Sequence, residues 1–183
     1  MKPLFIATER FDASNGEAWE KYCQFAKIPN LIEVVSLDQI LCHRLVAKFK
    51  PADWDHIVNE DFRLDYFLHL DYLLKRIAGH RRRNVLGLYR NPESHITQSP
   101  GQGNFVFMGY DLVEEVTQVS ALTNCGGFPK AFSNQELSPQ GLIQDYGRAF
   151  QVRVALAEAY PEEHHAQCEL YAIWRLNELP QQV

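Results

Sequence analysis

The chain has 183 residues, of which 46% are hydrophobic and 22% charged, a composition that suits one packed domain and excludes an intrinsically disordered chain. Its formal net charge of −5 favours solubility and disfavours non-specific binding to nucleic acid. The N-terminal apolar run is too short for a signal peptide, and no apolar stretch approaches the ~20 residues of a membrane helix, so we expect a soluble cytoplasmic protein with reduced thiols.

The N-terminal part is predicted to alternate strands and helices. Residues 3–8 form the first expected strand. Ser14 and Glu17 have the spacing of a capping box, in which each side chain binds the other's backbone amide, and this predicts a helix that ends before Pro29. A short run rich in β-branched residues at 31–35 predicts the second strand.

Helices are expected to dominate the segment that follows. Ser36 and Gln39 make a second capping box and predict a helix over about 37–48. A short helix over 52–59 and a longer one over 64–78 come next. The longer helix is expected to turn one apolar stripe toward the core, formed by Phe67, Leu70, Leu74 and Ile77.

The central part of the chain has the pattern of strands joined by a long loop. Strands are predicted at 85–89 and 105–110, and the loop over 91–104 holds two Pro and two Gly with few apolar residues. Long loops are often functional, so a small-molecule cleft beside this loop is one hypothesis. Residues 112–123 fit a helix or a strand, and we favour a strand for their second half.

The C-terminal part carries the two clearest patterns. Pro139 after Ser138 predicts the longest helix, over about 139–159, and alternation at 168–176 predicts the last strand. Because strands and helices do not alternate strictly, we predict one α+β domain over 1–183, with a mixed or mainly antiparallel sheet packed by four or five helices. Its core is expected to include Trp19, Tyr22, Phe67, Leu70, Leu74, Phe107, Tyr146, Phe150 and Trp174.

One thiol is a candidate for catalysis, although the sequence lacks a phosphate-binding loop, a dinucleotide fingerprint and a nucleophile elbow. Cys125 precedes two glycines, and the amides of such an open backbone can stabilise a thiolate or an oxyanion. His165 is the candidate base. The alternative is a tight turn in which Cys125 only fills space.

A His/Cys cluster at 164–168 offers ligands for a metal ion. His164, His165 and Cys168 lie within five residues, and together with Cys125 they would make a set that suits zinc. Zinc sites in small domains usually have paired ligands at both ends, whereas Cys125 has no partner within four residues. The alternative is a solvated connection before the last strand, with Cys168 pointing into the core.

An acidic segment is a candidate surface for a partner. The carboxylates of this segment are interleaved with aromatic rings. The candidate residues are Asp53, Trp54, Asp55, Asp61 and Asp65. This is the pattern expected of a surface that binds a basic protein. The alternative is an ordinary solvated helix face.

A basic segment follows the helix predicted over 64–78. Arg81, Arg82 and Arg83 come directly after His80. The dipole of a helix favours cations at its C-terminal end, which explains the run without any function. Contact with a phosphate or with an acidic partner is the sharper alternative, and nucleic acid is disfavoured because no aromatic residue is interleaved.

Two hypotheses for the function follow from these patterns. The first, which we favour, is a non-catalytic intracellular protein-binding or regulatory domain, for example an inhibitor or immunity-type protein that binds a basic partner. It needs no cofactor, and self-association stays open. The second is a thiol- or metal-dependent enzyme centred on Cys125 and the 164–168 cluster, with zinc as the metal.

Overall fold

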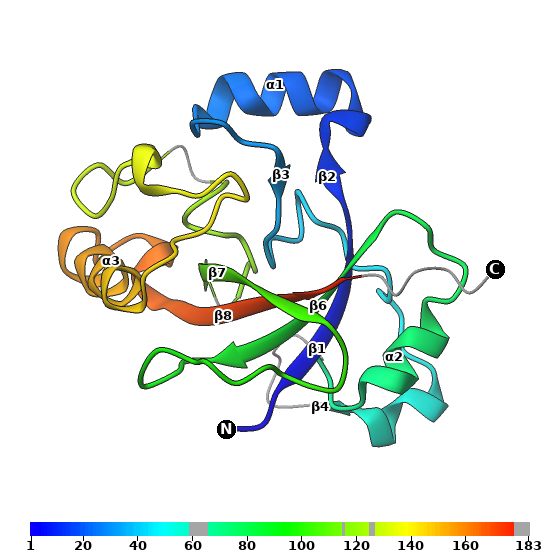
Figure 1. Cartoon of the computed structure of the whole chain (residues 1–183). Coiled ribbons are helices and arrows are strands. Elements are labelled where there is room, and N and C mark those ends of the chain that lie inside the picture. The colour runs from blue at the N-terminus through cyan, green and yellow to red at the C-terminus, as the bar shows by residue number, and fades with distance from the viewer. Residues whose placement is uncertain (59–65, 115, 125–126, 178–183) are drawn as a thin grey trace.

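A six-stranded antiparallel sheet forms the centre of the molecule (Figure 1). The computed structural model describes residues 1–58, 66–114, 116–124 and 127–177. The strand order is β4-β5-β1-β6-β8-β7, and each of these neighbouring pairs is antiparallel. The α+β class is therefore confirmed, and of the two sheet types expected the antiparallel one is found. The organisation as a single domain stays a prediction.

The sheet combines four strands of six or more residues with two strands of two residues. Its strands are β1 (Leu4–Glu9), β4 (Ile57–Val58), β5 (Tyr66–Phe67), β6 (Arg83–Arg90), β7 (Phe105–Glu114) and β8 (Cys168–Leu176). A separate two-stranded sheet pairs β2 (Phe11–Asp12) with β3 (Glu33–Val34). The strands expected at 3–8, 85–89, 105–110 and 168–176 are thus present with small shifts of their ends.

Three α-helices and four short 3-10 helices lie within the described ranges. The α-helices are α1 (Glu17–Ala26), α2 (Leu70–Arg76) and α3 (Tyr146–Ala159). The 3-10 helices are η1 (Ala13–Asn15), η2 (Pro51–His56), η3 (Asn134–Glu136) and η4 (His164–Gln167). Among the helices of these ranges, none combines the length and apolar character that crossing a membrane requires.

Helices α2 and α3 pack on the sheet at opposite ends (Figure 1). Ala149, Val152 and Leu156 of α3 are fully buried against side chains of β7 and β8. Leu73 of α2 and the residue that follows the helix, Ile77, are fully buried against β1 and β6. The buried apolar face of each helix holds it on the sheet.

Non-helical chain packs on other side chains of the same strands. Val35, Leu37 and Leu142 form an apolar cluster with Leu86 of β6 and Ile173 of β8. Because successive side chains of a strand point to opposite faces, this cluster lies on the face away from α2 and α3. The sheet is therefore covered on both faces.

The predicted aromatic core is present for most of its members. Trp19, Tyr22 and Phe67 are buried. Partly buried residues complete the set around them, namely Leu70, Leu74, Phe107, Tyr146 and Trp174. Phe150 is 40% exposed, so the prediction that it faces the core is wrong. Val152 takes the inner position of α3 instead.

The loop over 91–104 connects β6 to β7 as expected and lies partly against the sheet. Pro100 is buried on Gly87, where a Cβ atom would come within 2.3 Å of the proline Cγ. Tyr110 Oη lies 2.8 Å from His95 Nδ1. Only glycine in β6 leaves room for this approach of the loop.

The helix predicted over 37–48 is absent, and the capping box inferred for Ser36 is wrong. Ser36 Oγ donates to Asp111 Oδ2 at 2.6 Å. Asp38 accepts two backbone amides inside the segment, at 2.8 and 2.9 Å. Side chains that bind the backbone locally compete with helix formation, and here the hydrogen bonds to buried carboxylates keep the segment from forming a helix.

The helix predicted over 64–78 is shorter in the structure. Tyr66 and Phe67 belong to β5, where Phe67 pairs with Phe5 of β1. Residues 64–65 lie outside the described ranges. The pairing with the sheet takes precedence over the helical spacing of the apolar residues. The short helix predicted over 52–59 is present in part, as the 3-10 helix η2, and Ile57 and Val58 form β4. Residue 59 lies outside the described ranges.

The longest helix begins later than predicted. Asp145, not Ser138, caps α3, because its side chain accepts the Arg148 amide at 2.7 Å. Ser138 Oγ accepts the amides of two residues in the turn that follows it. Ile143 then bridges Tyr110 of β7 through two backbone hydrogen bonds of 2.7 and 3.1 Å. The bridge to the sheet keeps this segment extended.

Two smaller predictions are also wrong. Helix α1 is present, but its cap is Gly16, and the capping box belongs to Asp12 and Asn15 around η1. In the ambiguous segment 112–123 residues 112–114 are strand, because β7 continues to Glu114. The second half forms a turn with one isolated bridge to the sheet.

Candidate functional site

The proposed thiol and metal cluster is only partly described by the structure. Cys125 lies outside the described residues, so its proposed roles stay predictions. His164 and His165 belong to η4, and Cys168 is the first residue of β8, where it is buried. The simple interpretation of Cys168 as a core residue agrees with this burial.

His165 lies in a half-buried position beside an aromatic ring. Its ring centroid is 5.1 Å from that of Phe128. Burial lowers the pKa of His165, and the carboxylates of Glu114 and Glu163 act against this shift. A neutral imidazole is what a base or a metal ligand requires. In the ranges that the structure describes, however, no three His, Cys, Asp or Glu side chains are grouped to hold a metal ion.

The acidic segment is divided by burial. Asp53 is fully buried, whereas Trp54 is 55% exposed and Asp55 is exposed. Asp61 and Asp65 lie outside the described residues. Of the described members of this set, Trp54 and Asp55 are exposed to solvent.

Asp53 holds η2 to α2. Its carboxylate accepts from Arg76 Nε at 2.8 Å, from the Tyr72 hydroxyl at 2.7 Å and from the Lys50 amide at 2.6 Å. Burial raises the pKa of this carboxyl, but the hydrogen bonds outweigh it and lower the pKa of Asp53 to about 2. The sequence pattern could not reveal this, because Arg76 is 23 residues away.

Asp53 is expected to contribute to acid unfolding. Its native pKa of about 2 lies below the unfolded value of ~3.9. The ionised form therefore stabilises the fold above about pH 4, and this stabilisation is lost as the pH falls through about 2. Urea unfolding of Asp53→Asn should show a shallower loss of stability across this range than the wild type. Asp55→Asn, at the exposed neighbour, should keep the wild-type slope, and an unchanged slope in Asp53→Asn would contradict the assignment.

The three consecutive arginines have three different environments. Arg83 donates to the Ile77 carbonyl at 2.8 Å, next to the C-terminal end of α2. Arg82 Nη2 donates to Asp12 at 3.2 Å and to Asn15 at 3.0 Å. Arg81 is exposed and makes no side-chain hydrogen bond or ion pair with the part of the chain that the structure describes. Only Arg83 fits the simple helix-end interpretation.

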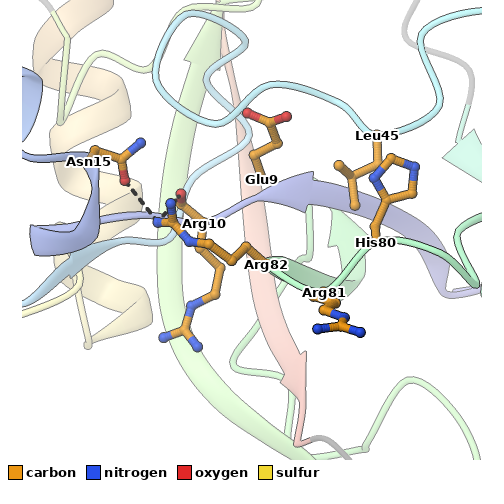
Figure 2. Close-up of a pocket in the computed structure, with 7 residues that line it drawn as sticks. All are labelled: Glu9, Arg10, Asn15, Leu45, His80, Arg81 and Arg82. Atoms are coloured by element: carbon orange, nitrogen blue, oxygen red, sulfur yellow. Dashed lines mark hydrogen bonds between the residues drawn. The ribbon is translucent and has the colours of Figure 1, made fainter.

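A pocket of about 250 Å³ lies beside Arg81 and Arg82 (Figure 2). We call it the arginine pocket, and it is lined by Glu9, Arg10, Asn15, Leu45, His80, Arg81 and Arg82. Its residues come from the end of β1, from η1, from the segment that crosses β1 at Arg44 and from the turn before β6. Figure 2 shows Arg82 reaching across to Asn15, while the Arg81 guanidinium points elsewhere.

A buried carboxylate holds Arg10 at one side of this pocket. Glu33 of β3 is 4% exposed and accepts from Arg10 Nε at 3.0 Å and Arg10 Nη2 at 2.9 Å. It also accepts from Arg175 Nη1 at 2.8 Å and from Asn84 Nδ2 at 2.7 Å. Such a bidentate pair fixes the plane and position of the guanidinium.

The sequence analysis did not identify Arg10, Asn15 or Glu33. One signal was present, because Glu33 is a single carboxylate inside a short apolar strand, and a carboxylate there needs cationic partners. The identity of those partners depends on chain segments 23 and 142 residues away. No local pattern contains this information.

Comparisons of the chain with models of known protein families, with curated proteins and with solved structures found no match. The functional argument therefore rests on the residues themselves. The lining of the arginine pocket includes three arginines, one histidine and one asparagine, together with the carboxylate of Glu9, on a concave surface. Guanidinium groups recognise carboxylate and phosphate oxygens through paired hydrogen bonds, so this arrangement suits an anionic group.

Proposed function

We propose that this chain is a non-catalytic protein-binding domain that takes a carboxylate or phosphate group of its partner into the arginine pocket. The observation that carries the proposal is the pair of neighbouring arginines at the pocket. Arg82 is positioned by Asp12 and Asn15, and Arg81 beside it has no described side-chain partner. A positioned donor next to an unpaired cation is a favourable site for an anion.

Pre-organisation supports this role for Arg82. Its contacts use only Nη2, and its Nε and Nη1 atoms make no hydrogen bond within the described residues. The N–H groups of these two atoms remain available as donors to an anion, each on its own edge of the guanidinium. Because the side chain is already held in place, binding costs less conformational entropy.

The overall charge of −5 makes this pocket a local exception on the protein. An acidic molecule repels most acidic partners at long range, so the partner must present its anionic group at a short, defined segment. This favours a single acidic or phosphorylated side chain within a protein segment over a polyanion such as nucleic acid.

Fluorescence anisotropy with labelled peptides tests the proposal. We expect peptides with several Glu residues or with phosphoserine to bind saturably, and binding to weaken as salt is raised. Arg81→Ala should weaken binding about fivefold, the ~1 kcal/mol of an exposed ion pair, and the double variant Arg81→Glu, Arg82→Glu should abolish it. Lys21→Ala removes an exposed charge on α1, away from the pocket lining, and should bind as the wild type does.

The result that would overturn the proposal is equally direct. Absence of saturable binding by either peptide, or equal binding by the wild type and the double glutamate variant, would contradict a role for the pocket. Thermal unfolding of each variant separates a lost contact from a lost fold.

A second candidate surface fits the basic partner predicted from the sequence, of the kind that an inhibitor or immunity-type protein binds. It is supported by Trp54, which is 55% exposed beside the exposed Asp55. Large aromatic side chains are the common anchors of protein interfaces. A lysine-rich peptide in the same assay, with Trp54→Ala as the variant, distinguishes the two surfaces.

A further inference from the structure

A pair of histidines lies on the surface near α2, away from the arginine pocket. His56 Nδ1 and His69 Nδ1 are 3.0 Å apart, and His56 is half-buried whereas His69 is exposed. His56 is the last residue of η2, and His69 caps the N-terminal end of α2. The pair is not explained by the protein-binding function and does not depend on it.

The two histidines are held by the backbone of neighbouring segments. The Leu68 amide donates to the His56 carbonyl at 2.8 Å, and Ile57 pairs with Phe67 across β4 and β5. Each histidine is therefore one residue from a backbone contact that joins the two segments. Their side chains are brought together by the fold rather than by chance rotation of long, free side chains.

The His56 ring also packs on the ring of Tyr72. The two rings are stacked, with centroids 3.7 Å apart and planes 14° from parallel. The Tyr72 hydroxyl in turn donates to Asp53 and to the Ala52 carbonyl, at 2.7 and 3.0 Å. This support restricts the His56 ring to the side of His69, which lowers the entropic cost of binding a ligand between them.

The distance between the two nitrogens matches that of two ligands on one metal ion. With metal–nitrogen bonds of about 2.05 Å, two ligands at 90° are about 2.9 Å apart, and two ligands at the tetrahedral angle are about 3.3 Å apart. The observed 3.0 Å lies between these two values, so it fits either geometry. Ligands at 90° are found in the square-planar and octahedral geometries of Cu²⁺ and Ni²⁺.

From this geometry we infer that His56 and His69 together bind a divalent transition-metal ion through their Nδ1 atoms, with water in the remaining positions. Imidazole is a common ligand for copper, nickel and zinc. In the metal-free pair one Nδ1 donates its proton to the other. Coordination needs both lone pairs, so that proton moves to Nε2 of the same ring, and each ring stays neutral with no net release of protons. Water fills the other positions because, among the described residues, no third His, Cys, Asp or Glu joins the group.

Calorimetric titration of the untagged protein with CuCl₂, NiCl₂ and ZnCl₂ tests this inference. We expect one ion per chain, with Cu²⁺ bound more tightly than Ni²⁺ or Zn²⁺, as in the general affinity order of divalent metals for nitrogen ligands. His56→Gln and His69→Gln should each weaken binding at least tenfold. His43→Gln removes a single exposed histidine, and His164→Gln tests the other histidine pair, and both should bind as the wild type does.

A second measurement places the ion without any variant. Paramagnetic Cu²⁺ at a small fraction of the protein concentration should broaden the amide signals of His56, Leu68 and His69 before others. Broadening centred on residues 164–165, or equal affinity in the wild type and in both glutamine variants, would overturn the inference. Absence of binding by all three ions would do the same.

Discussion

The variant Asp111→Ala is expected to lower the free energy of unfolding by about 4 kcal/mol, a large part of the 5–15 kcal/mol that stabilises an ordinary domain. Asp111 of β7 is fully buried and its carboxylate accepts four hydrogen bonds. Two of the donors are the backbone amides of Leu37 and Leu112, at 3.2 and 2.9 Å. Neither amide gains an acceptor from alanine, and an unsatisfied buried donor costs about 1–3 kcal/mol.

The other two donors of Asp111 extend the effect to a second carboxylate. Ser36 Oγ and Ser120 Oγ each donate to Asp111 at 2.6 Å. The Ser36 hydroxyl also accepts the Asp38 amide, and Asp38 Oδ2 accepts the Ser120 amide at 2.9 Å. Removal of Asp111 therefore frees both hydroxyls to rotate and loosens the turn that replaces the expected helix over 37–48.

Urea unfolding at neutral pH measures the effect of Asp111→Ala. Asp71→Ala, which removes an exposed carboxylate from the first turn of α2, is the matched control and should change stability by less than about 0.5 kcal/mol. Equal stability of the two variants would show that the buried network contributes nothing.

Asp111→Asn separates the charge of this residue from its shape. Burial raises the pKa of Asp111, against the hydrogen bonds from Ser120, Ser36 and the Leu37 amide, and the charge of Asp38 raises it further. The native state therefore binds this proton more tightly than the unfolded state. The stabilisation of the fold by protonated Asp111 is complete below about pH 4 and is lost as the pH rises through the raised pKa. Asp111→Asn should lack this loss of stability with rising pH. The effect expected for Asp53 is the opposite, a loss of stability with falling pH.

The same network explains which parts of the fold the sequence could predict. β8 was predicted with its observed bounds, because alternation of Leu170, Ala172 and Trp174 with Tyr171 and Ile173 is a local property. The segment 37–48 was predicted wrongly because the Ser36 hydroxyl of the expected capping box with Gln39 is equally suited to bind elsewhere. The partners that keep this segment from forming a helix are Asp111 and Ser120, which lie more than 70 residues away in the sequence.

The prediction for a short apolar segment at the edge of the sheet was wrong for a related reason. Phe67 has helical spacing with Leu70 and Leu74, and yet its partner in the structure is Phe5 of β1. Helical periodicity and pairing with a distant strand bury the same ring. The choice between them depends on the free edge of β1, which no local window of the sequence contains.

The candidate site shows the same division between local and distant information. The run of three arginines identified a cationic segment, and Arg81 and Arg82 do line the pocket. Burial of Asp53 was not predicted, because the spacing of carboxylates and rings does not reveal the Arg76 side chain beside it. Arg10 and Asn15 entered the site only through the fold, since β1, η1 and the turn before β6 meet there.

Glu33→Ala is expected to lower the free energy of unfolding by about 3 kcal/mol, within the range found when one partner of a buried ion pair is removed. The Glu33 side chain is 6% exposed, and it binds Arg10, Arg175 and Asn84. Asn84 is 2% exposed, so its amide would lose its acceptor without access to water. The two arginine side chains are 41% and 26% exposed and can regain hydration, which keeps the cost at the lower end of that range.

Glu33→Gln divides this effect into charge and hydrogen bonding. The amide of glutamine keeps one acceptor for Asn84 or an arginine, and it removes the charge that holds Arg10 and Arg175 together, so we expect about half the loss of Glu33→Ala. The matched control is Glu17→Ala, which removes a side chain that is 78% exposed and paired with Lys21 on the surface of α1, and which should cost less than about 0.5 kcal/mol. Urea unfolding of all three variants measures the series. If Glu33→Ala is no less stable than Glu17→Ala, then the two arginines are held by other contacts, and the pocket does not depend on this buried carboxylate for the position of Arg10.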